Sequence, residues 1–166
     1  EEIVKNSGMD YIIFRPSLIY GDGDQFVLRL KKIIHDAPVI PIIGAGESRL
    51  QPIFIDDLVE CLIKAITTLQ LKNRTFCIAG LEQIKFKDVV IRIADAMAIK
   101  RPSFHVPVFL MRPAAMIMEN ILPKPPVTVD QITMLQMDNI CDIKEMRDVF
   151  NIEPIPFNEG LRRFLK

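Results

Sequence analysis

The stretch that decides the fold runs from Asp10 to Phe26 and reads DYIIFRPSLIYGDGDQF. Its continuous apolar run, Tyr11 to Phe14, predicts a strand that is covered on both faces of a sheet. Arg-Pro-Ser follows this strand, and a glycine turn then leads into the beginning of a helix. Ligand sites of α/β proteins are often built where parallel strands end in this way. The stretch therefore predicts an α/β protein with a candidate site directly after this strand.

Further elements follow from the spacing of apolar residues. A helix is expected from residue 26 to residue 34, and short strands are expected within residues 50–57 and 75–79. Asp57, with Glu60 three residues later, is typical of a capping box at the start of the next helix. The buried stripe expected on that helix comprises Leu58, Cys61, Leu62, Ala65, Ile66 and Leu69. A second amphipathic helix should bury Phe86, Val89, Val90, Ile93, Ala94 and Met97.

The last third of the chain has a different character, because prolines separate short helical pieces. Helices are expected at residues 114–122 with Pro113 just before them, at 143–150 and at 157–165. Thr128 and Gln131 form a second capping-box pattern. We therefore divide the chain into an α/β part, residues 1–100, and a proline-rich, mostly helical lobe, residues 101–166.

Composition excludes some classes of function. The 21 Lys and Arg residues balance the 21 Asp and Glu residues, which gives no support for a nucleic-acid partner. Three widely spaced cysteines without a CxxC pair suggest reduced thiols in a cytoplasmic protein. Neither the cysteines nor the two histidines have the spacing of metal ligands, so no metal site is expected.

Two glycine pairs and a histidine pair have simple structural interpretations. Gly21-Asp22-Gly23 and Gly44-Ala45-Gly46 lack the third glycine of a dinucleotide fingerprint, so tight turns are favoured. For His35 and His105, surface or structural roles are favoured over catalysis. No catalytic residue is predicted in this chain.

A few polar and apolar residues remain candidates for binding. Arg15 could bind an anion or close the strand end by pairing with a carboxylate, and the sequence leaves both open. Arg49 and Gln51 flank the entry to a short strand beside a glycine turn, which makes them candidates for ligand contacts. A methionine cluster is interpreted as adaptable core in preference to a lipid or cofactor site; it comprises Met111, Met116, Met118, Met134 and Met137.

The order of segments resembles the C-terminal half of an extended or atypical short-chain dehydrogenase/reductase. The segments that carry the resemblance are SGMDYIIFRPSLIYGDGD, GAGESRLQPIFIDDLVECLIKAI, TFCIAG and PPVTVDQITMLQMDNI. The last is similar to the branch that includes the dehydrogenase-like accessory subunit of respiratory complex I. The resemblance implies the C-terminal part of a Rossmann-like, doubly wound sheet with a small substrate-side lobe.

The same resemblance implies an NAD or NADP cofactor in the full-length parent only. The family's N-terminal half carries a GxxGxxG phosphate loop and a catalytic YxxxK pair, and this sequence contains neither. Tyr11 and Tyr20 are followed four residues later by Arg15 and Asp24, not by lysine. We expect a substrate-side fragment of an oxidoreductase or nucleotide-sugar epimerase-like parent, inactive without its N-terminal cofactor-binding half. The alternative is a non-catalytic NAD(P)-binding scaffold like the complex I subunit.

The implied site residues follow from matching positions. Pro16, Ser17 and Leu18 correspond to the segment that passes the nicotinamide end of the cofactor. Substrate contacts are expected from Arg49, Gln51 and Met111, within an apolar wall at residues 111–118. Epimerases place an arginine at the position of Leu50, and Arg49 is one residue early, which argues against nucleotide-sugar chemistry and favours the atypical branch. The methionine segment suits a small-molecule substrate greasier than a sugar nucleotide. A homodimer or association with a membrane complex is also compatible with the resemblance.

Overall fold

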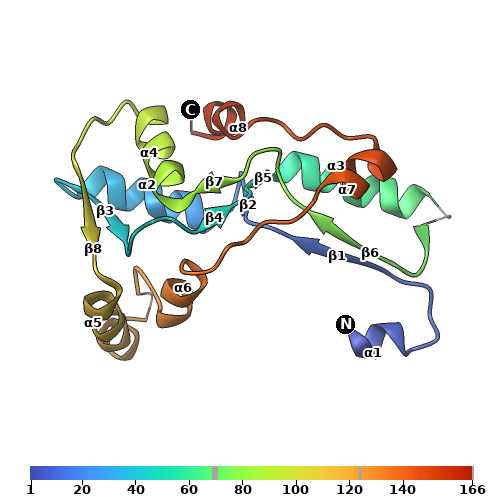
Figure 1. Ribbon diagram of the computed structural model, residues 1–166, viewed down its shortest axis with the longest axis horizontal. Helices are drawn as coiled ribbons and strands as arrows, with labels where there is room; N and C mark the ends of the chain where they lie inside the picture. Colours follow the sequence, from blue (N-terminus) through green and yellow to red (C-terminus); the bar gives the residue numbers. More distant parts are fainter. Residues whose placement is uncertain (69–70, 124, 166) are drawn as a thin grey trace.

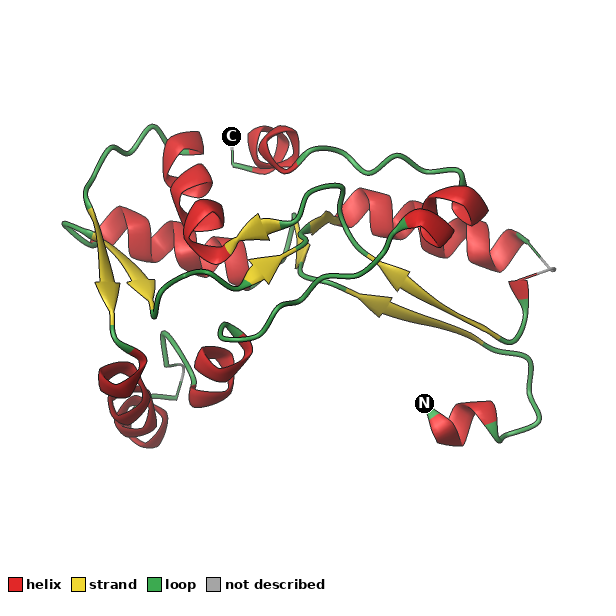
Figure 2. Cartoon of the chain, in the orientation of Figure 1, coloured by secondary structure: helices red, strands yellow, loops and turns green. Residues whose placement is uncertain are grey.

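A computed structural model gives the structure of the chain and describes residues 1–68, 71–123 and 125–165. Eight helices and eight strands are found among these residues (Figures 1 and 2). In the first half they are α1 (Glu2–Lys5), β1 (Ile12–Pro16), β2 (Ile19–Tyr20), α2 (Phe26–Asp36), β3 (Ile40–Ile43), β4 (Arg49–Leu50), β5 (Ile53–Phe54) and α3 (Ile55–Thr67). They continue with β6 (Arg74–Ile78), β7 (Ile84–Lys85), α4 (Phe86–Ala96), β8 (Ser103–Val106), α5 (Val108–Ile121), α6 (Val129–Met134), α7 (Lys144–Phe150) and α8 (Phe157–Phe164).

The strands form four short pairs, of which three are parallel. β1 pairs with β6, β2 with β5 and β3 with β8 in parallel, while β4 and β7 are antiparallel. α3 connects β5 of one parallel pair to β6 of another, and α2 connects β2 to β3 in the same way. The predicted α/β class, with parallel strands joined by helices, is therefore confirmed.

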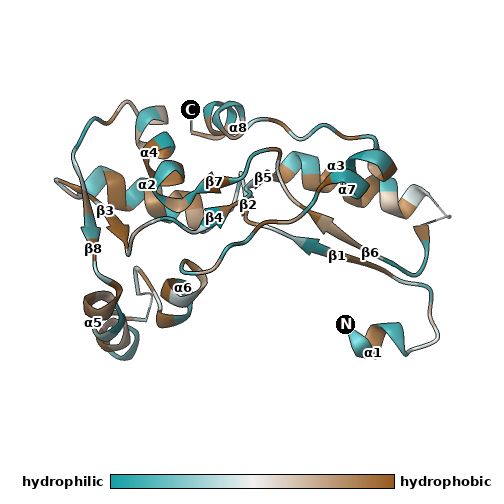
Figure 3. Ribbon diagram, in the orientation of Figure 1, coloured by the Kyte–Doolittle hydropathy of each residue, from teal (hydrophilic) through white to brown (hydrophobic). Residues whose placement is uncertain are grey.

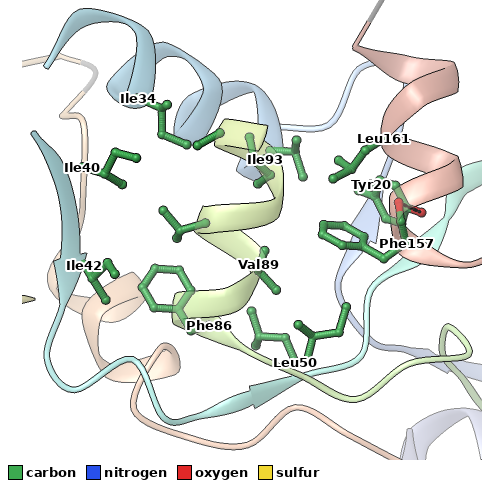
Figure 4. Packing of buried hydrophobic residues seen from close by; sticks show 14 of the residues in the cluster. Tyr20, Ile34, Ile40, Ile42, Leu50, Phe86, Val89, Ile93, Phe157 and Leu161 are labelled. Carbon is green, nitrogen blue, oxygen red and sulfur yellow. Dashed lines mark hydrogen bonds between the residues drawn. The ribbon is translucent and has the colours of Figure 1, made fainter. Parts of the chain in front are cut away.

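Two clusters of buried side chains hold the helices on these strands. One cluster lies between α3, α7 and the β1–β6 pair, where Phe14 and Phe76 both contact the ring of Phe150 edge-on. The other surrounds α4, and Figure 4 shows Phe86, Val89 and Ile93 of this helix among side chains from β3, α2 and α8. The predicted apolar stripe of α4 is buried as expected, with Met97 half-buried at its end.

β1 has a partner strand on one side only within the described residues. The C=O of Tyr11 accepts from Asn73 and the N–H of Ser17 donates to Ile78, so odd-numbered residues of this segment face β6. Because backbone groups alternate along a strand, the N–H and C=O groups of Ile12 and Phe14 point to the opposite edge. That edge is open in the described structure.

Elements in the last third of the chain pair with or pack on elements of the first part at several places. β8 pairs with β3, α7 packs on α3 and α8 packs on α4. α5 and α6 pack on each other, away from the helices that cover the β1–β6 pair (Figure 1). The predicted division into residues 1–100 and 101–166 stays a prediction, because contacts between the two parts do not define a domain boundary.

The capping box predicted at Asp57 is wrong. α3 begins at Ile55 without a side-chain cap, and Asp57 instead accepts a hydrogen bond of 3.0 Å from the N–H of Ile155. The helix begins three residues earlier than predicted, so Asp57 lies in its first turn and is buried toward the C-terminal segment. The predicted stripe is buried at Leu58, Cys61 and Ala65, whereas Leu62 and Ile66 are exposed. Leu69 lies outside the described residues.

Pro113 lies inside α5 and not before it, contrary to the prediction. The helix begins six residues earlier than expected, at Val108, directly after Pro107. The capping box of Thr128 and Gln131 is confirmed at the start of α6. Among the residues described, no helix is both long enough and apolar enough to cross a membrane.

Candidate functional site

The chain changes its partner strand directly after β1. The N–H of Ser17 donates to the C=O of Ile78 at 2.8 Å, which extends the pairing with β6. One residue later, the C=O of Leu18 accepts from the N–H of Ile53 at 2.8 Å, which begins the pairing with β5. Pro16 is exposed at this point, and Ser17 and Leu18 are half-buried. The three residues predicted to lie near a cofactor are therefore at the carboxyl end of a parallel strand.

Arg49 is bound to Asp138 by both its backbone and its side chain. The backbone N–H of Arg49 donates to Oδ1 of Asp138 at 2.7 Å, and the guanidinium nitrogens Nε and Nη2 donate to Oδ2 at 3.0 and 2.7 Å. These hydrogen bonds, first the backbone one and then those of the guanidinium, lower the pKa of the Asp138 carboxyl. About half of each side chain remains exposed, so the guanidinium has an accessible face.

Gln51 is buried, and both ends of its amide are used within the chain. Its Nε2 donates to the C=O of Gly80 at 2.8 Å, and its Oε1 accepts from the N–H of Cys141 at 2.9 Å. Only 2% of the residue is exposed. Gln51 therefore holds two backbone segments together at the site.

The segment from Asp138 to Cys141 brings the predicted residues together. The hydroxyl of Ser17 donates to the C=O of Asn139 at 3.1 Å, and the N–H of Asn139 donates to the C=O of Arg49 at 2.8 Å. Ser17, Arg49 and Gln51 therefore each contact at least one residue of this four-residue segment. Met111 is not part of this group; it lies half-buried on α5.

The thiol of Cys141 is next to these groups. Burial, and then the neighbouring Cys77, raise the pKa of the Cys141 thiol to about 12. The neutral thiol is therefore the form present near pH 7, and it is a poor nucleophile. Nothing in the described parts of the chain gathers three or more His, Cys, Asp or Glu side chains that could hold a metal ion.

Two shallow hollows lie near the segment that follows Asp138. One, of about 500 Å³, is lined by Gln51, Cys141 and neighbouring residues, including Gln83. The other, of about 630 Å³, runs along α7 and is lined largely by charged side chains, including Lys144 and Arg147. Neither hollow is lined by Ser17 or Arg49, but the smaller one is lined by Gln51, so we place the candidate site at the strand ends and not along α7.

The glycine turns do not offer a phosphate cradle. The carboxylate of Asp24 accepts from the N–H of Gly21 at 3.4 Å and from the N–H of Val27 at 2.6 Å. These groups, at the entry to α2, are the ones that a phosphate would need. Gly21 and Gly23 have φ angles of 140° and 81°, as expected for the turn that the sequence predicts. These turns therefore do not form a phosphate-binding loop.

Sequence reasoning missed Asp138, Asn139 and Cys141. The quoted segment ending in MDNI contains the first two residues, but it served only to identify the branch of the family and was not assigned to the site. Their role depends on contacts with Ser17 and Arg49, which are 122 and 89 residues away in the chain. A single sequence contains no periodic signal for such contacts.

Residues 1–79 match the model of the NAD dependent epimerase/dehydratase family. A 3beta-hydroxysteroid-dehydrogenase/decarboxylase, isoform 2, from Arabidopsis thaliana is 26% identical, with 98% of this chain and 33% of the relative covered. Subunit 9 of the NADH dehydrogenase (ubiquinone) 1 alpha subcomplex, mitochondrial, from Dictyostelium discoideum is 24% identical, with 91% of this chain and 43% of the relative covered. The chain therefore spans about a third to two fifths of the length of these relatives.

A solved structure has a similar fold. A mutant UDP-glucuronic acid 4-epimerase from Bacillus cereus, in complex with UDP-4-deoxy-4-fluoro-glucuronic acid and NAD, has a TM-score of 0.67. It is 18% identical, and the match covers 95% of this chain and 45% of the epimerase. The family match and the curated relatives bear out the resemblance to short-chain dehydrogenase/reductases of the NAD-dependent epimerase/dehydratase type, and the solved structure shows the same fold.

Proposed function

We propose that residues 1–166 form the substrate-side part of an NAD(P)-binding short-chain dehydrogenase-like protein, of the oxidoreductase or epimerase type. A further, cofactor-binding part of the same protein would pair with the open edge of β1. The observation that carries this proposal is that edge: β1 is a parallel strand with a neighbour on one side only within the described residues.

Physical reasons favour such a continuation. Parallel sheets are normally covered on both faces and extend over several strands, because a pair of strands buries too little apolar surface. The backbone groups of Ile12 and Phe14 at the open edge can accept a further strand. The lengths of the relatives support the proposal, since this chain covers less than half of each of them.

The proposed roles of the site residues follow from their positions. Pro16, Ser17 and Leu18 would lie against the nicotinamide end of NAD or NADP, whose hydride chemistry this chain does not itself supply. Arg49 would offer its exposed guanidinium face to a polar group of the substrate. Gln51 would position the backbone of Gly80 and Cys141 next to the substrate through its two hydrogen bonds. Met111 would contribute to an adaptable apolar wall.

The substrate would be a small molecule, and an apolar one is favoured over a sugar nucleotide. The Arabidopsis relative is named for action on a 3beta-hydroxysteroid, and the fold neighbour is a nucleotide-sugar epimerase. Arg49 is committed to Asp138 and lies one position away from the epimerase arginine, which supports the apolar alternative.

Calorimetry on two proteins tests the proposal. Residues 1–166 alone and the full-length protein are titrated with NAD(H) and NADP(H). We expect micromolar binding by the full-length protein and none at that level by residues 1–166, since the phosphate-binding part is absent from them. Micromolar binding by residues 1–166 alone would show that the cofactor site lies within this chain.

A non-catalytic scaffold is the second candidate. The complex I subunit among the relatives supports it, and so do the polar groups of the site, which are used to hold the chain together at Gln51 and Asp138. The sequence directly before Glu1 in the full-length protein discriminates between the two candidates. A YxxxK pair there favours an enzyme, and its loss favours the scaffold.

A further inference from the structure

The two charged residues of α5, Arg112 and Glu119, lie on the side of the helix that contacts α6. Arg112 donates from Nη2 to the hydroxyl of Thr133 at 3.0 Å, and Glu119 accepts from the N–H of Val129 at 2.9 Å. Ala115, the buried residue of this helix, lies on the same side. A surface helix normally places its charges in water and its apolar side chains inside. In α5 the charged side chains remain exposed, but the side opposite to them is apolar and exposed as well.

The opposite side of α5 carries no charged residue at all. We call it the outer face of α5, and at helical spacing it comprises Phe109, Leu110, Pro113, Ala114, Met116, Ile117, Asn120 and Ile121. Its members are exposed, with Phe109 at 72%, Ile117 at 59% and Ile121 at 71%. The side-chain amide of Asn120 donates to the C=O of Met116 at 2.8 Å, within the helix itself. Figure 3 shows α5 as a mostly hydrophobic helix at one end of the molecule.

The exposure of the methionines corrects one expectation from the sequence. The methionine cluster was expected to be core, yet Met116, Met134 and Met137 are exposed and only Met111 and Met118 are half-buried. Contiguous exposed apolar patches of this kind mark interaction sites on folded proteins.

Three occupants of this face can be compared: a further domain of the same protein, a second copy of the chain and a lipid surface. In Figure 1, α6 lies between α5 and β1, so a strand added at the β1 edge would lie away from α5. A second copy would need about 800 Å² from each partner and about one hydrogen bond per 100–200 Å². The outer face of α5 belongs to a single helix of 14 residues, and the amide of Asn120 is already used within that helix.

We propose that the outer face of α5 binds the surface of a lipid bilayer. Hydrocarbon makes no hydrogen bonds with a protein and does not tolerate charges. The outer face of α5 fits both conditions, because it has no charged residue and its one side-chain amide is bonded within the helix. The 14 residues of α5 extend about 21 Å, less than the ~30 Å of a hydrocarbon core, so the helix would lie along the membrane and not across it. Because the face is uncharged, binding would depend on apolar burial and would not require anionic lipids.

Flotation with vesicles of pure phosphatidylcholine tests the proposal on the full-length protein. We expect the protein to float with the vesicles equally at low and high salt. Ile117→Glu and, separately, Ile121→Glu should each lower the bound fraction at least about tenfold, since a charge would enter the apolar region. Ile63→Glu is the matched control, because Ile63 is 56% exposed on α3, at the other end of the molecule. It should leave flotation unchanged.

A fluorescent variant gives a second measurement. The chain has no tryptophan, so Ile117→Trp introduces a single reporter into residues 1–166. Its emission should shift to the blue when vesicles are added and should be quenched by brominated acyl chains. Far-ultraviolet circular dichroism establishes that each variant is folded.

Three results would overturn the proposal. The first is a folded wild-type protein that stays with the unbound fraction, and the second is an equal loss of flotation in Ile63→Glu. The third is a concentration-dependent dimer that Ile117→Glu converts to a monomer while vesicles bind neither form. That result would assign the outer face of α5 to a second copy of the chain.

Discussion

Gln51 and Gly80 are joined by two hydrogen bonds that run in opposite directions. The side-chain amide of Gln51 donates to the C=O of Gly80 at 2.8 Å, and the N–H of Gly80 donates to the backbone C=O of Gln51 at 3.2 Å. The same side chain accepts from Cys141, so three segments of the candidate site depend on one buried amide.

Gln51→Ala should therefore lower the free energy of unfolding by at least about 2 kcal/mol, because the buried C=O of Gly80 and the N–H of Cys141 lose their partner. Urea denaturation measures the change. Gln83→Ala is the control, since Gln83 is exposed, and we expect its effect to stay within about 0.5 kcal/mol. Equal stability of the two variants would show that the Gln51 bridge contributes little.

Gly80 itself has no room for a side chain. A Cβ at this position would lie 1.8 Å from the C=O oxygen of Pro52, which is backbone and cannot move away easily. Gly80→Ala should cost about 3 kcal/mol of unfolding free energy through overpacking. Gly8→Ala, where the space is open but φ is 74°, should cost about 1 kcal/mol. The ranking of their thermal midpoints checks this, and the reverse order would contradict it.

Arg49→Ala should change stability by no more than about 1 kcal/mol, because its ion pair with Asp138 is half exposed. It should also raise the pKa of the Asp138 carboxyl toward the ordinary value of 3.8, since its hydrogen bonds with Arg49 lower that pKa. Carbon-detected NMR titration of the Asp138 side chain measures this shift. Lys72→Ala, which removes an exposed ion pair with Asp10, should leave the titration of Asp138 unchanged. The backbone N–H of Arg49 remains, so we expect a partial shift.

Asp57 makes stability depend on pH in the opposite sense from most carboxylates. Burial raises the pKa of Asp57 above its ordinary value of 3.8, so the folded protein holds this proton more tightly than the unfolded chain. Its contribution to stability is therefore present at low pH and is lost as pH rises through the raised pKa.

Asp57→Asn removes this dependence and keeps an oxygen that can accept from Ile155. Relative to wild type, the variant should gain stability as pH increases from 4 to 7, in urea denaturation at several pH values. Asp56→Asn, at an exposed neighbour, should show no such trend. A constant difference between Asp57→Asn and wild type would mean that the carboxyl titrates normally.

Much of the fold could be predicted because it depends on local patterns. The apolar run at Tyr11–Phe14 became β1, and the spaced apolar residues between Phe86 and Met97 became the buried side of α4. The capping box of Thr128 and Gln131 also follows from residues three apart. Patterns of this kind are set by the period of the helix or strand, which a single sequence displays.

The candidate site could be predicted only in part, because its contacts are long-range. Ser17, Arg49 and Gln51 do lie together, and their roles as ligand contacts stay predictions. The partner segment around Asp138 could not be inferred from the spacing of residues. Asp57 was misassigned for the same reason: a local rule favoured a cap, whereas the carboxylate is used by Ile155, 98 residues later.

The open edge of β1 has a consequence for how this polypeptide must be handled in a cell. A row of unpaired backbone groups on Ile12 and Phe14 is a template on which another chain can add a strand. Residues 1–166 produced without a neighbour for β1 would therefore self-associate as their concentration rises, and chaperones would retain them. Synthesis from the N-terminus would avoid this hazard in a longer protein, because a sheet already formed upstream would receive β1 as it left the ribosome.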